Sequence, residues 1–145
     1  MEEKIMSAVN IHRSTCDTDD ETLLSLAREA MKRSYSPYSS YPVGAALHCT
    51  DGRIFLGCNI ENASFGLTNC AERTAIFKAV SEGATNFDTI AIAAKTKAWP
   101  CGACRQVMNE FAPGIRVLVT WDNHVEEKSL SDLLPEGFGP HSMDQ

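Results

Sequence analysis

Apolar residues recur along the chain with two different periods, and these periods predict helices that alternate with short strands. Near the start they recur at helical spacing, behind two aspartates that can cap a helix. A helix is therefore expected from Asp19 or Asp20 to about Ser34, and residues 36–40, which contain Pro37, should end it. Its expected apolar face consists of Leu23, Leu24, Ala27, Ala30 and Met31.

Strand-like apolar runs follow, interrupted by two further helical segments. The expected strands cover residues 43–50, 53–58, 89–94, 115–120 and 125–129. Asp51-Gly52 is typical of a two-residue hairpin turn. Helices should begin near Cys70 and Cys101, which predicts strand–helix units and a parallel centre to the sheet. Residues 121–124 are too few for a crossover helix, so the last two strands should be antiparallel.

Composition places the chain among ordinary globular proteins. It has 145 residues, of which 43% are hydrophobic and 22% charged. We expect a flexible N-terminal extension over residues 1–19, where no clear period is present, and one folded domain over residues 20–145. There is no membrane-length apolar run and no secretory leader pattern, so the expectation is a cytoplasmic protein without a membrane partner. The formal net charge of −6 argues against nucleic acid as a partner.

The six cysteines do not suggest a disulfide framework, because no secretory signal accompanies them and the core is of normal size. Cys49 and Cys58 lie in apolar stretches and are expected to be buried core thiols. Cys16 lies in a polar segment and is expected to be a free surface thiol.

The remaining three cysteines form two clusters at the starts of the predicted helices. Cys70 lies two residues before Glu72, and Cys101 and Cys104 follow Pro100. Thiolates suit zinc, and helix N-termini stabilise their negative charge. Three protein ligands leave the fourth tetrahedral position open, which is typical of a catalytic zinc site. Glu72 is then placed to move protons between water and substrate.

Two other interpretations of the thiols remain open at this point. Cys101 and Cys104 are also compatible with a redox Cys-x-x-Cys pair at a helix start. A structural zinc site would need a fourth ligand, for which His48, Cys49 and Cys58 are the candidates by sequence.

The clusters belong to a longer pattern that resembles the homotetrameric, zinc-dependent cytidine deaminases of the three-cysteine type. The matching segments are Cys70-Ala71-Glu72-Arg73-Thr74-Ala75, Pro100-Cys101-Gly102-Ala103-Cys104-Arg105-Gln106, Gly57-Cys58-Asn59-Ile60-Glu61-Asn62, Tyr38-Ser39 through Val43-Gly44-Ala45-Ala46, and Leu133-Leu134-Pro135 with Phe138. The resemblance implies a three-layer α/β/α fold with a five-stranded mixed sheet and an antiparallel last strand. It also makes residues 20–145 the catalytic domain.

The resemblance further implies a hydrolase of pyrimidine salvage that converts cytidine and 2′-deoxycytidine to uridine and 2′-deoxyuridine with release of ammonia. Cys70, Cys101 and Cys104 would bind one Zn²⁺ per chain. A zinc-bound hydroxide would attack C4 of the base, with Glu72 as the proton shuttle.

Substrate contacts are implied at five further positions. Asn59 and Glu61 match a pair that binds the 3′-hydroxyl of the sugar, and Ala71 matches a substrate contact beside Glu72. Tyr41 and Phe138 should flank the base, with Phe138 reaching the site of a neighbouring subunit of the homotetramer.

Four further positions could affect the metal site or the substrate contacts. Arg73 matches an arginine that donates hydrogen bonds to the zinc thiolates, whereas Arg105 is either a similar positive group or a packing arginine. Tyr41 stands where the family usually has Phe and adds a hydroxyl that needs a partner. Trp99 stands where the family often has a small residue, and its ring could narrow the pocket.

The sequence favours deamination of free cytidine over two alternative functions. Deaminases of cytosine nucleoside antibiotics lack the pair formed here by Asn59 and Glu61. A polynucleotide-editing deaminase or RNA-binding module is disfavoured by the acidic balance and by the short connection before the last strand.

Overall fold

A mixed β-sheet forms the centre of the molecule. The structure is a computed structural model that describes residues 19–144, so Cys16 and the expected extension before Asp19 lie outside it. Five strands occur in the described part, in the order β2-β1-β3-β4-β5. They are β1 (Val43–Cys49), β2 (Ile54–Cys58), β3 (Phe87–Ala94), β4 (Arg116–Trp121) and β5 (His124–Ser129). Only β3 and β4 are parallel, and β5 pairs antiparallel to β4, as predicted.

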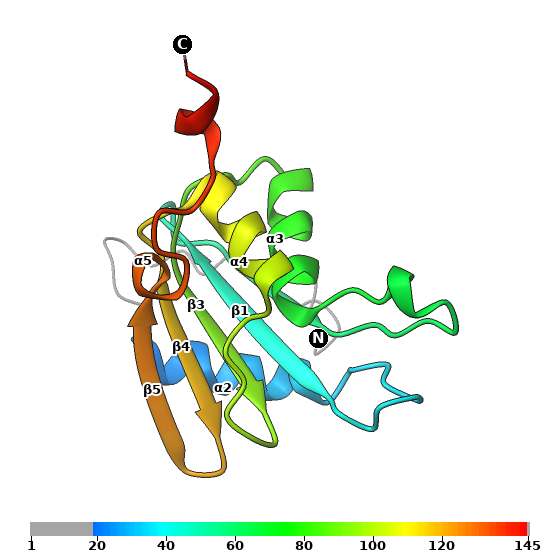
Figure 1. Ribbon diagram of the computed structural model, residues 1–145. Coiled ribbons are helices and arrows are strands. Elements are labelled where there is room, and N and C mark those ends of the chain that lie inside the picture. Colours follow the sequence, from blue (N-terminus) through cyan, green and yellow to red (C-terminus); the bar gives the residue numbers. More distant parts are fainter. Residues whose placement is uncertain (1–18, 145) are drawn as a thin grey trace.

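Helices cover both faces of this sheet (Figure 1). Helix α2 (Asp20–Met31) packs on one face, where its buried leucines and alanines meet Ala46, Leu56 and Leu118 of the strands. Helices α3 (Ala71–Ser81) and α4 (Gly102–Phe111) cover the other face, with the short α5 (Leu130–Leu133) beside them. The expected three-layer α/β/α arrangement is therefore confirmed. None of the described helices is long and apolar enough to cross a membrane.

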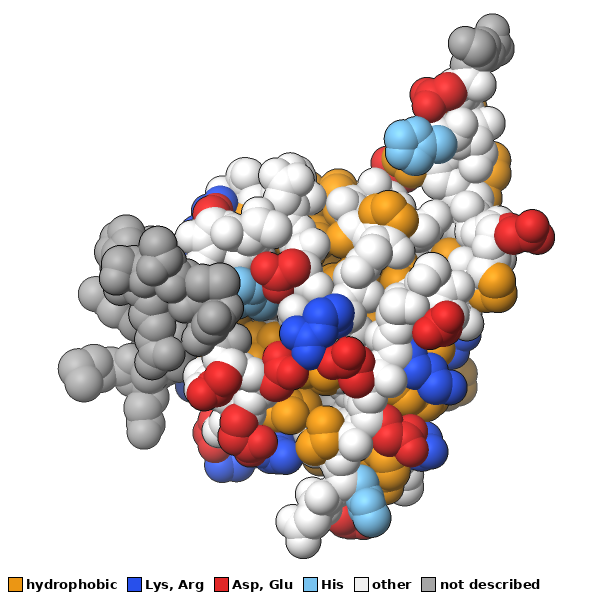
Figure 2. Space-filling view, turned by 90° about the vertical axis from the view of Figure 1, so that its left-hand side faces the viewer, with side chains coloured by type: hydrophobic (Ala, Val, Ile, Leu, Met, Phe, Trp, Pro, Cys, Tyr) orange, Lys and Arg blue, Asp and Glu red, His pale blue; other side chains and the backbone are white. Residues whose placement is uncertain are grey.

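Two short 3₁₀ helices lie outside these layers, at Phe65–Leu67 and Pro140–Met143. The first belongs to the loop between β2 and α3. The second belongs to the C-terminal segment, which extends away from the body of the molecule (Figures 1 and 2).

The ends of several elements differ from the sequence prediction. Helix α2 ends at Met31 rather than near Ser34, because the next residues bond three positions back: Arg33 N donates to Ala30 O and Ser34 N to Met31 O. Strand β3 begins at Phe87 rather than Thr89, since the buried Phe87 side chain extends the apolar run past a polar residue.

The hairpin between β1 and β2 is confirmed, but its two-residue turn is wrong. Cys49 N donates to Arg53 O at 2.8 Å, which leaves Thr50, Asp51 and Gly52 as a three-residue turn. Gly52 has a φ of 93°, a left-handed conformation that glycine adopts at little cost. The glycine therefore closes the turn from its third position rather than from its second.

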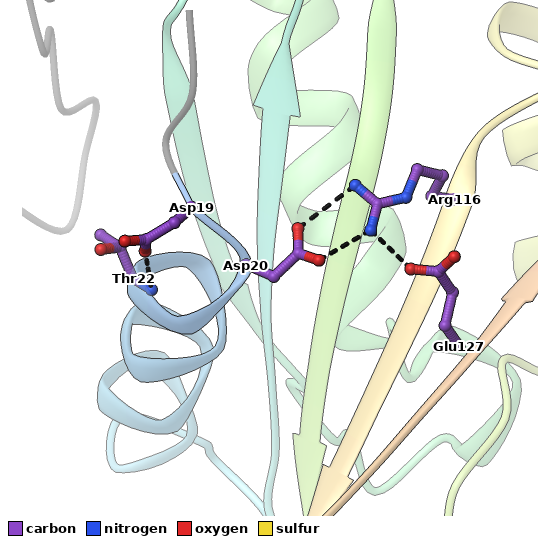
Figure 3. Close-up of polar contacts among 5 residues, drawn as sticks. All are labelled: Asp19, Asp20, Thr22, Arg116 and Glu127. Atoms are coloured by element: carbon purple, nitrogen blue, oxygen red, sulfur yellow. Dashed lines mark hydrogen bonds and ion pairs between the residues drawn. The ribbon is translucent and has the colours of Figure 1, made fainter.

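The start of α2 is fixed by its own cap and by an ion pair to the sheet (Figure 3). The Asp19 side chain accepts a hydrogen bond from Thr22 N at 2.8 Å, which confirms the predicted cap. Arg116 on β4 binds Asp20 at 2.7 Å and also pairs with Glu127 on β5. On the face shown in Figure 2, acidic and basic side chains are interspersed. Exposed pairs of this kind orient the helix but stabilise the fold only slightly.

A glycine on β2 lets α3 approach the sheet closely. A Cβ atom at Gly57 would lie 2.4 Å from the carbonyl oxygen of Ala71 and 2.5 Å from Ala75 N. Any side chain there would push the first turn of α3 away from the sheet. Since that turn carries Glu72 and follows Cys70, Gly57 sets the depth at which both side chains lie.

Gly57→Ala is therefore expected to lower the free energy of unfolding by about 1–3 kcal/mol, the usual effect of overpacking. The matched control is Gly114→Ala, because a Cβ at Gly114 meets nothing within 4 Å. Urea unfolding of both variants would test this. Equal unfolding midpoints for the two variants would show that the contact between β2 and α3 tolerates a methyl group.

Candidate active site

Three thiols from two helix starts meet in one place. Cys70 is the N-cap residue of α3, Cys101 is the N-cap residue of α4, and Cys104 lies in the first turn of α4. The Cys70 and Cys101 Sγ atoms are 3.8 Å apart, the Cys101 and Cys104 Sγ atoms 3.5 Å, and all three lie within 4.8 Å of one another. Sulfur ligands about 2.3 Å from a tetrahedral zinc ion lie roughly 3.8 Å from each other. The cluster therefore has the chemistry and the dimensions of a three-thiolate zinc site.

The cluster has no fourth protein ligand within the described part of the chain. His48 binds Asp88 at 2.7 Å, and the Cys58 thiol donates to Arg33 O at 3.4 Å. Cys49 is buried, as predicted, and this burial raises the pKa of its thiol to about 12. Cys58 is only partly buried, so the prediction of a core thiol holds in part there. A zinc ion here would keep its fourth position open, as in catalytic rather than structural sites.

Arg73 supports the thiols electrostatically. Its Nη2 donates to Cys70 Sγ at 3.1 Å. A hydrogen bond with Cys104, together with the Arg73 guanidinium, lowers the pKa of Cys70 to about 5 in spite of burial. The Cys70 thiolate is thus available near neutral pH.

Arg105 has a different role, because both of its described hydrogen bonds go to backbone. Its Nε donates to Pro100 O and its Nη1 to Leu133 O, each at 2.7 Å. This arginine ties the loop before Cys101 to α5, which matches the packing alternative.

A cavity of about 180 Å³ opens beside the thiols. Its described lining residues are Val43, Asn59, Thr68, Cys70, Ala71, Glu72, Ile92, Ala98, Trp99 and Cys101. Glu72 is buried, and this burial raises the pKa of its carboxyl group above the usual range. A carboxyl group with a raised pKa accepts a proton readily and is suited to general acid–base chemistry.

The predicted sugar pair is divided between two neighbouring cavities. Asn59 lines the thiol cavity, where its Oδ1 accepts from Val43 N at 2.9 Å and from the Ser34 hydroxyl. Glu61 lines an adjacent cavity of about 370 Å³ with Ser39, whose N and hydroxyl both donate to its carboxylate. Thr68 lines both cavities, so the two lie next to each other.

The two predicted aromatic contacts lie outside the thiol cavity in this chain. Tyr41 bonds Thr96 Oγ1 through its hydroxyl at 2.7 Å, which supplies the partner that the extra hydroxyl needs. Its carbonyl accepts from Asn59 Nδ2 at 2.9 Å. Phe138 is 60% exposed, on the segment that extends from the body. The structure therefore brings Ala71, Glu72 and Asn59 to the thiols but not Tyr41 or Phe138.

Thr68 and Ser39 are polar residues of the two cavities that the sequence did not indicate as site residues. Thr68 follows a loop without hydrophobic period, and nothing local marks it as a wall of two cavities. Ser39 stands within a matching segment beside Tyr38, but its link to Glu61 joins residues 22 positions apart.

Comparisons with known proteins agree with this geometry. The protein-family model of the cytidine and deoxycytidylate deaminase zinc-binding region matches residues 17–120 of this chain. A cytidine deaminase of Sporosarcina psychrophila is 46% identical over 129 residues, which cover 86% of this chain and 95% of the relative. A cytidine deaminase of Halalkalibacterium halodurans is 48% identical over 129 residues, which cover 86% of this chain and 98% of that relative.

Solved structures give the same result. The crystal structure of cytidine deaminase from Burkholderia pseudomallei superposes with a TM-score of 0.79 at 44% identity, and covers 83% of this chain and 100% of that chain. The crystal structure of cytidine deaminase from Mycobacterium tuberculosis gives a TM-score of 0.75 at 39% identity. This match covers 85% of this chain and 99% of that chain.

The fold and the open three-thiol site together define a zinc-dependent hydrolase. The chain belongs to the cytidine and deoxycytidylate deaminase family, as the resemblance predicted. Zinc is the cofactor that its cysteine cluster fits, and membership of this family disfavours the redox interpretation of Cys101 and Cys104.

Cys101→Ala should remove zinc, because it leaves only two thiolates in the cluster. Metal analysis of the purified protein should find about one zinc per chain in the wild type and a small fraction of that in the variant. Cys58→Ala is the matched control, since Cys58 lies outside the cluster. Full zinc content in Cys101→Ala would contradict the assigned ligand set.

Proposed function

We propose that this chain hydrolyses cytidine and 2′-deoxycytidine to uridine and 2′-deoxyuridine. Water contributes the oxygen that replaces the 4-amino group, and ammonia leaves. The observation that carries the proposal is the buried Glu72 carboxyl group beside the three-thiol cluster, on a small cavity that Cys70 and Cys101 also line. Its support is the similarity of most of the chain to cytidine deaminases.

Zinc held by Cys70, Cys101 and Cys104 would supply Lewis-acid chemistry, lowering the pKa of a water molecule in the cavity. Glu72 takes a proton from that water and delivers it to N3 of the base. Once the water oxygen has bonded to C4, Glu72 takes the second proton from that oxygen and delivers it to the amino group, so that the bond from C4 to nitrogen breaks, a carbonyl forms at C4 and ammonia leaves. Burial raises the pKa of Glu72, which favours its role as proton acceptor.

The residues around Glu72 hold these groups in place. Arg73 offsets part of the thiolate charge through its hydrogen bond to Cys70. Ala71 lines the same cavity with a small side chain and leaves room for the base beside Glu72.

Glu72→Gln should retain zinc and the fold but lose about 10²–10⁴-fold in kcat, because the amide cannot carry the proton. Steady-state ammonia release and metal analysis measure the two effects separately. Glu82→Gln, at the exposed end of the same helix, is the control and should keep normal activity. A Glu72→Gln enzyme within a few-fold of wild type would exclude Glu72 as the proton carrier.

We infer that Asn59 and Glu61 bind the 3′-hydroxyl of the sugar, with the base in the thiol cavity and the sugar towards the adjacent one. Thr68 lines both cavities, and this supports a substrate that extends from one to the other. Glu61 is held by hydrogen bonds from the Ser39 hydroxyl and from Tyr38 N at 2.9 Å, and these bonds lower the pKa of its carboxyl group. Glu61 is therefore a fixed anionic acceptor at neutral pH.

Cytidine and 2′-deoxycytidine should be comparable substrates, because both have the 3′-hydroxyl. The value of kcat/KM for 3′-deoxycytidine should be lower by about 10-fold or more, since a hydrogen bond to a charged group is lost. Asn59→Ala and Glu61→Ala should reduce activity on the two natural nucleosides equally. Equal kcat/KM for cytidine and 3′-deoxycytidine would contradict this assignment.

We further propose that the active species is a homotetramer in which Phe138 completes a neighbouring subunit's site. Large apolar side chains are exposed on the loop after β2 and on the C-terminal segment: Phe65, Leu67, Phe138 and Met143. Exposed apolar groups of this size are typical of contacts between proteins. Symmetric assembly would let one subunit's C-terminal segment cover the site of another.

Hybrids test the shared site directly. Mixing inactive Glu72→Gln subunits with weakly active Phe138→Ala subunits should recover activity, because some sites combine Glu72 of one parent with Phe138 of the other. Light scattering should give the mass of a tetramer, and unmixed parents serve as controls. Proven mixing without recovered activity, or an active monomer, would rule out the shared site.

A further inference from the structure

Trp99 is the one aromatic side chain among the described residues that line the thiol cavity. Away from the thiols and Glu72, the apolar walls are formed by smaller side chains, those of Val43, Ala71, Ile92 and Ala98. The width of a cavity of about 180 Å³ therefore depends most on where the Trp99 indole lies.

The indole is held on two sides. Lys128 on β5 places its Nζ 5.0 Å from the centre of the ring, within the range of a cation–π interaction. Trp99 is half-buried and also packs against the core between the sheet and the helices α3 and α4. Turning the ring out of the cavity wall would cost both interactions.

The backbone at Trp99 is also constrained. Pro100 follows directly and disfavours the helical region for the residue before it. Arg105 anchors the same peptide segment, since its Nε donates to Pro100 O at 2.7 Å. The same guanidinium binds Leu133 O, so the segment is connected to α5 as well as to α4. Trp99 is thus a rigid part of the cavity wall.

We propose that Trp99 sets the upper size limit of the base, so that the enzyme accepts unsubstituted cytosine and rejects cytosines with a bulky substituent on the ring or the amino group. This inference rests on the proposed function, because it assigns the thiol cavity to the base. It adds a specificity determinant to the proton carrier and metal ligands. Trp99 acts sterically and takes part in no bond making or breaking.

The test compares kcat/KM for cytidine, 5-methylcytidine, 5-iodocytidine and N4-methylcytidine in wild type, Trp99→Phe and Trp99→Ala. In Trp99→Ala the ratio of substituted to unsubstituted substrate should rise by about 10–200-fold for the substituent that meets the indole, the range for a change of methylene size in an apolar pocket. Trp99→Phe should give an intermediate ratio. It also keeps the test valid if the alanine variant does not fold. A higher ratio of substituted to unsubstituted substrate, for a substituent at C5 or at N4 of the base, supports the proposal.

Trp121→Phe is the matched control. Trp121 stacks with His124 at 5.2 Å and lies outside the lining of the thiol cavity, so its replacement should leave the substrate ratios unchanged. Lys128→Met keeps Trp99 but removes its cation–π partner, and should raise the ratios by less than Trp99→Ala.

Binding gives a second measurement that needs no turnover. Calorimetry with the zinc-loaded proteins should show that Trp99→Ala improves the affinity for 5-iodouridine or 5-methyluridine relative to uridine. Unchanged kcat/KM and binding ratios in both Trp99 variants would overturn the role of Trp99. A wild type that binds uridine but releases no ammonia from cytidine would overturn the proposed function alone, because the binding ratios would still test Trp99.

Discussion

The position of three sulfur atoms within 4.8 Å of one another is the constraint on which the rest of this structure depends. Two different helices supply them, so the starts of α3 and α4 must meet at one point. Helix α4 lies between β3 and β4 in the chain, and the parallel pairing of these two strands sets the distance between them. Gly57 allows α3 to lie close to β2, and Arg105 fixes the loop that leads into α4. These features are far apart in the sequence and act together on the cluster.

The same constraint brings acidic groups together, of which Glu72 and Cys104 are buried, Cys70 is partly buried and Cys101 is exposed. Three thiols and the Glu72 carboxyl group lie together, and burial and the nearby Cys70 charge raise the pKa of Glu72. Arg73 and the two helix N-termini compensate part of this charge. A divalent cation would compensate the rest and favour deprotonation of the thiols. In this view the chemistry of Glu72 and the binding of zinc depend on each other, since the ion changes the electrostatic field in which the carboxyl group titrates.

Much of the fold and the metal site was predictable because the signals are local. The leucines and alanines of α2 recur at helical spacing, and Cys70 with Glu72 and Cys101 with Cys104 lie within single turns of the chain. The three-residue turn at Gly52 was not predicted, because both turn types contain glycine and differ only in register. Glu61 was expected beside Asn59, yet it lines an adjacent cavity, since its position depends on the folded segment around Ser39. The double role of Thr68 depends on the packing of distant elements and has no sequence signal.

Zinc bound by Cys70, Cys101 and Cys104 should keep its fourth position open. Zinc K-edge X-ray absorption of the purified protein measures this coordination directly. We expect three sulfur ligands at about 2.3 Å and one oxygen or nitrogen ligand at about 2.0 Å. Four sulfur ligands would indicate a closed structural site, and a zinc ion without sulfur ligands would place the metal elsewhere in the chain. Either result would rule out an open three-thiolate zinc site in this protein.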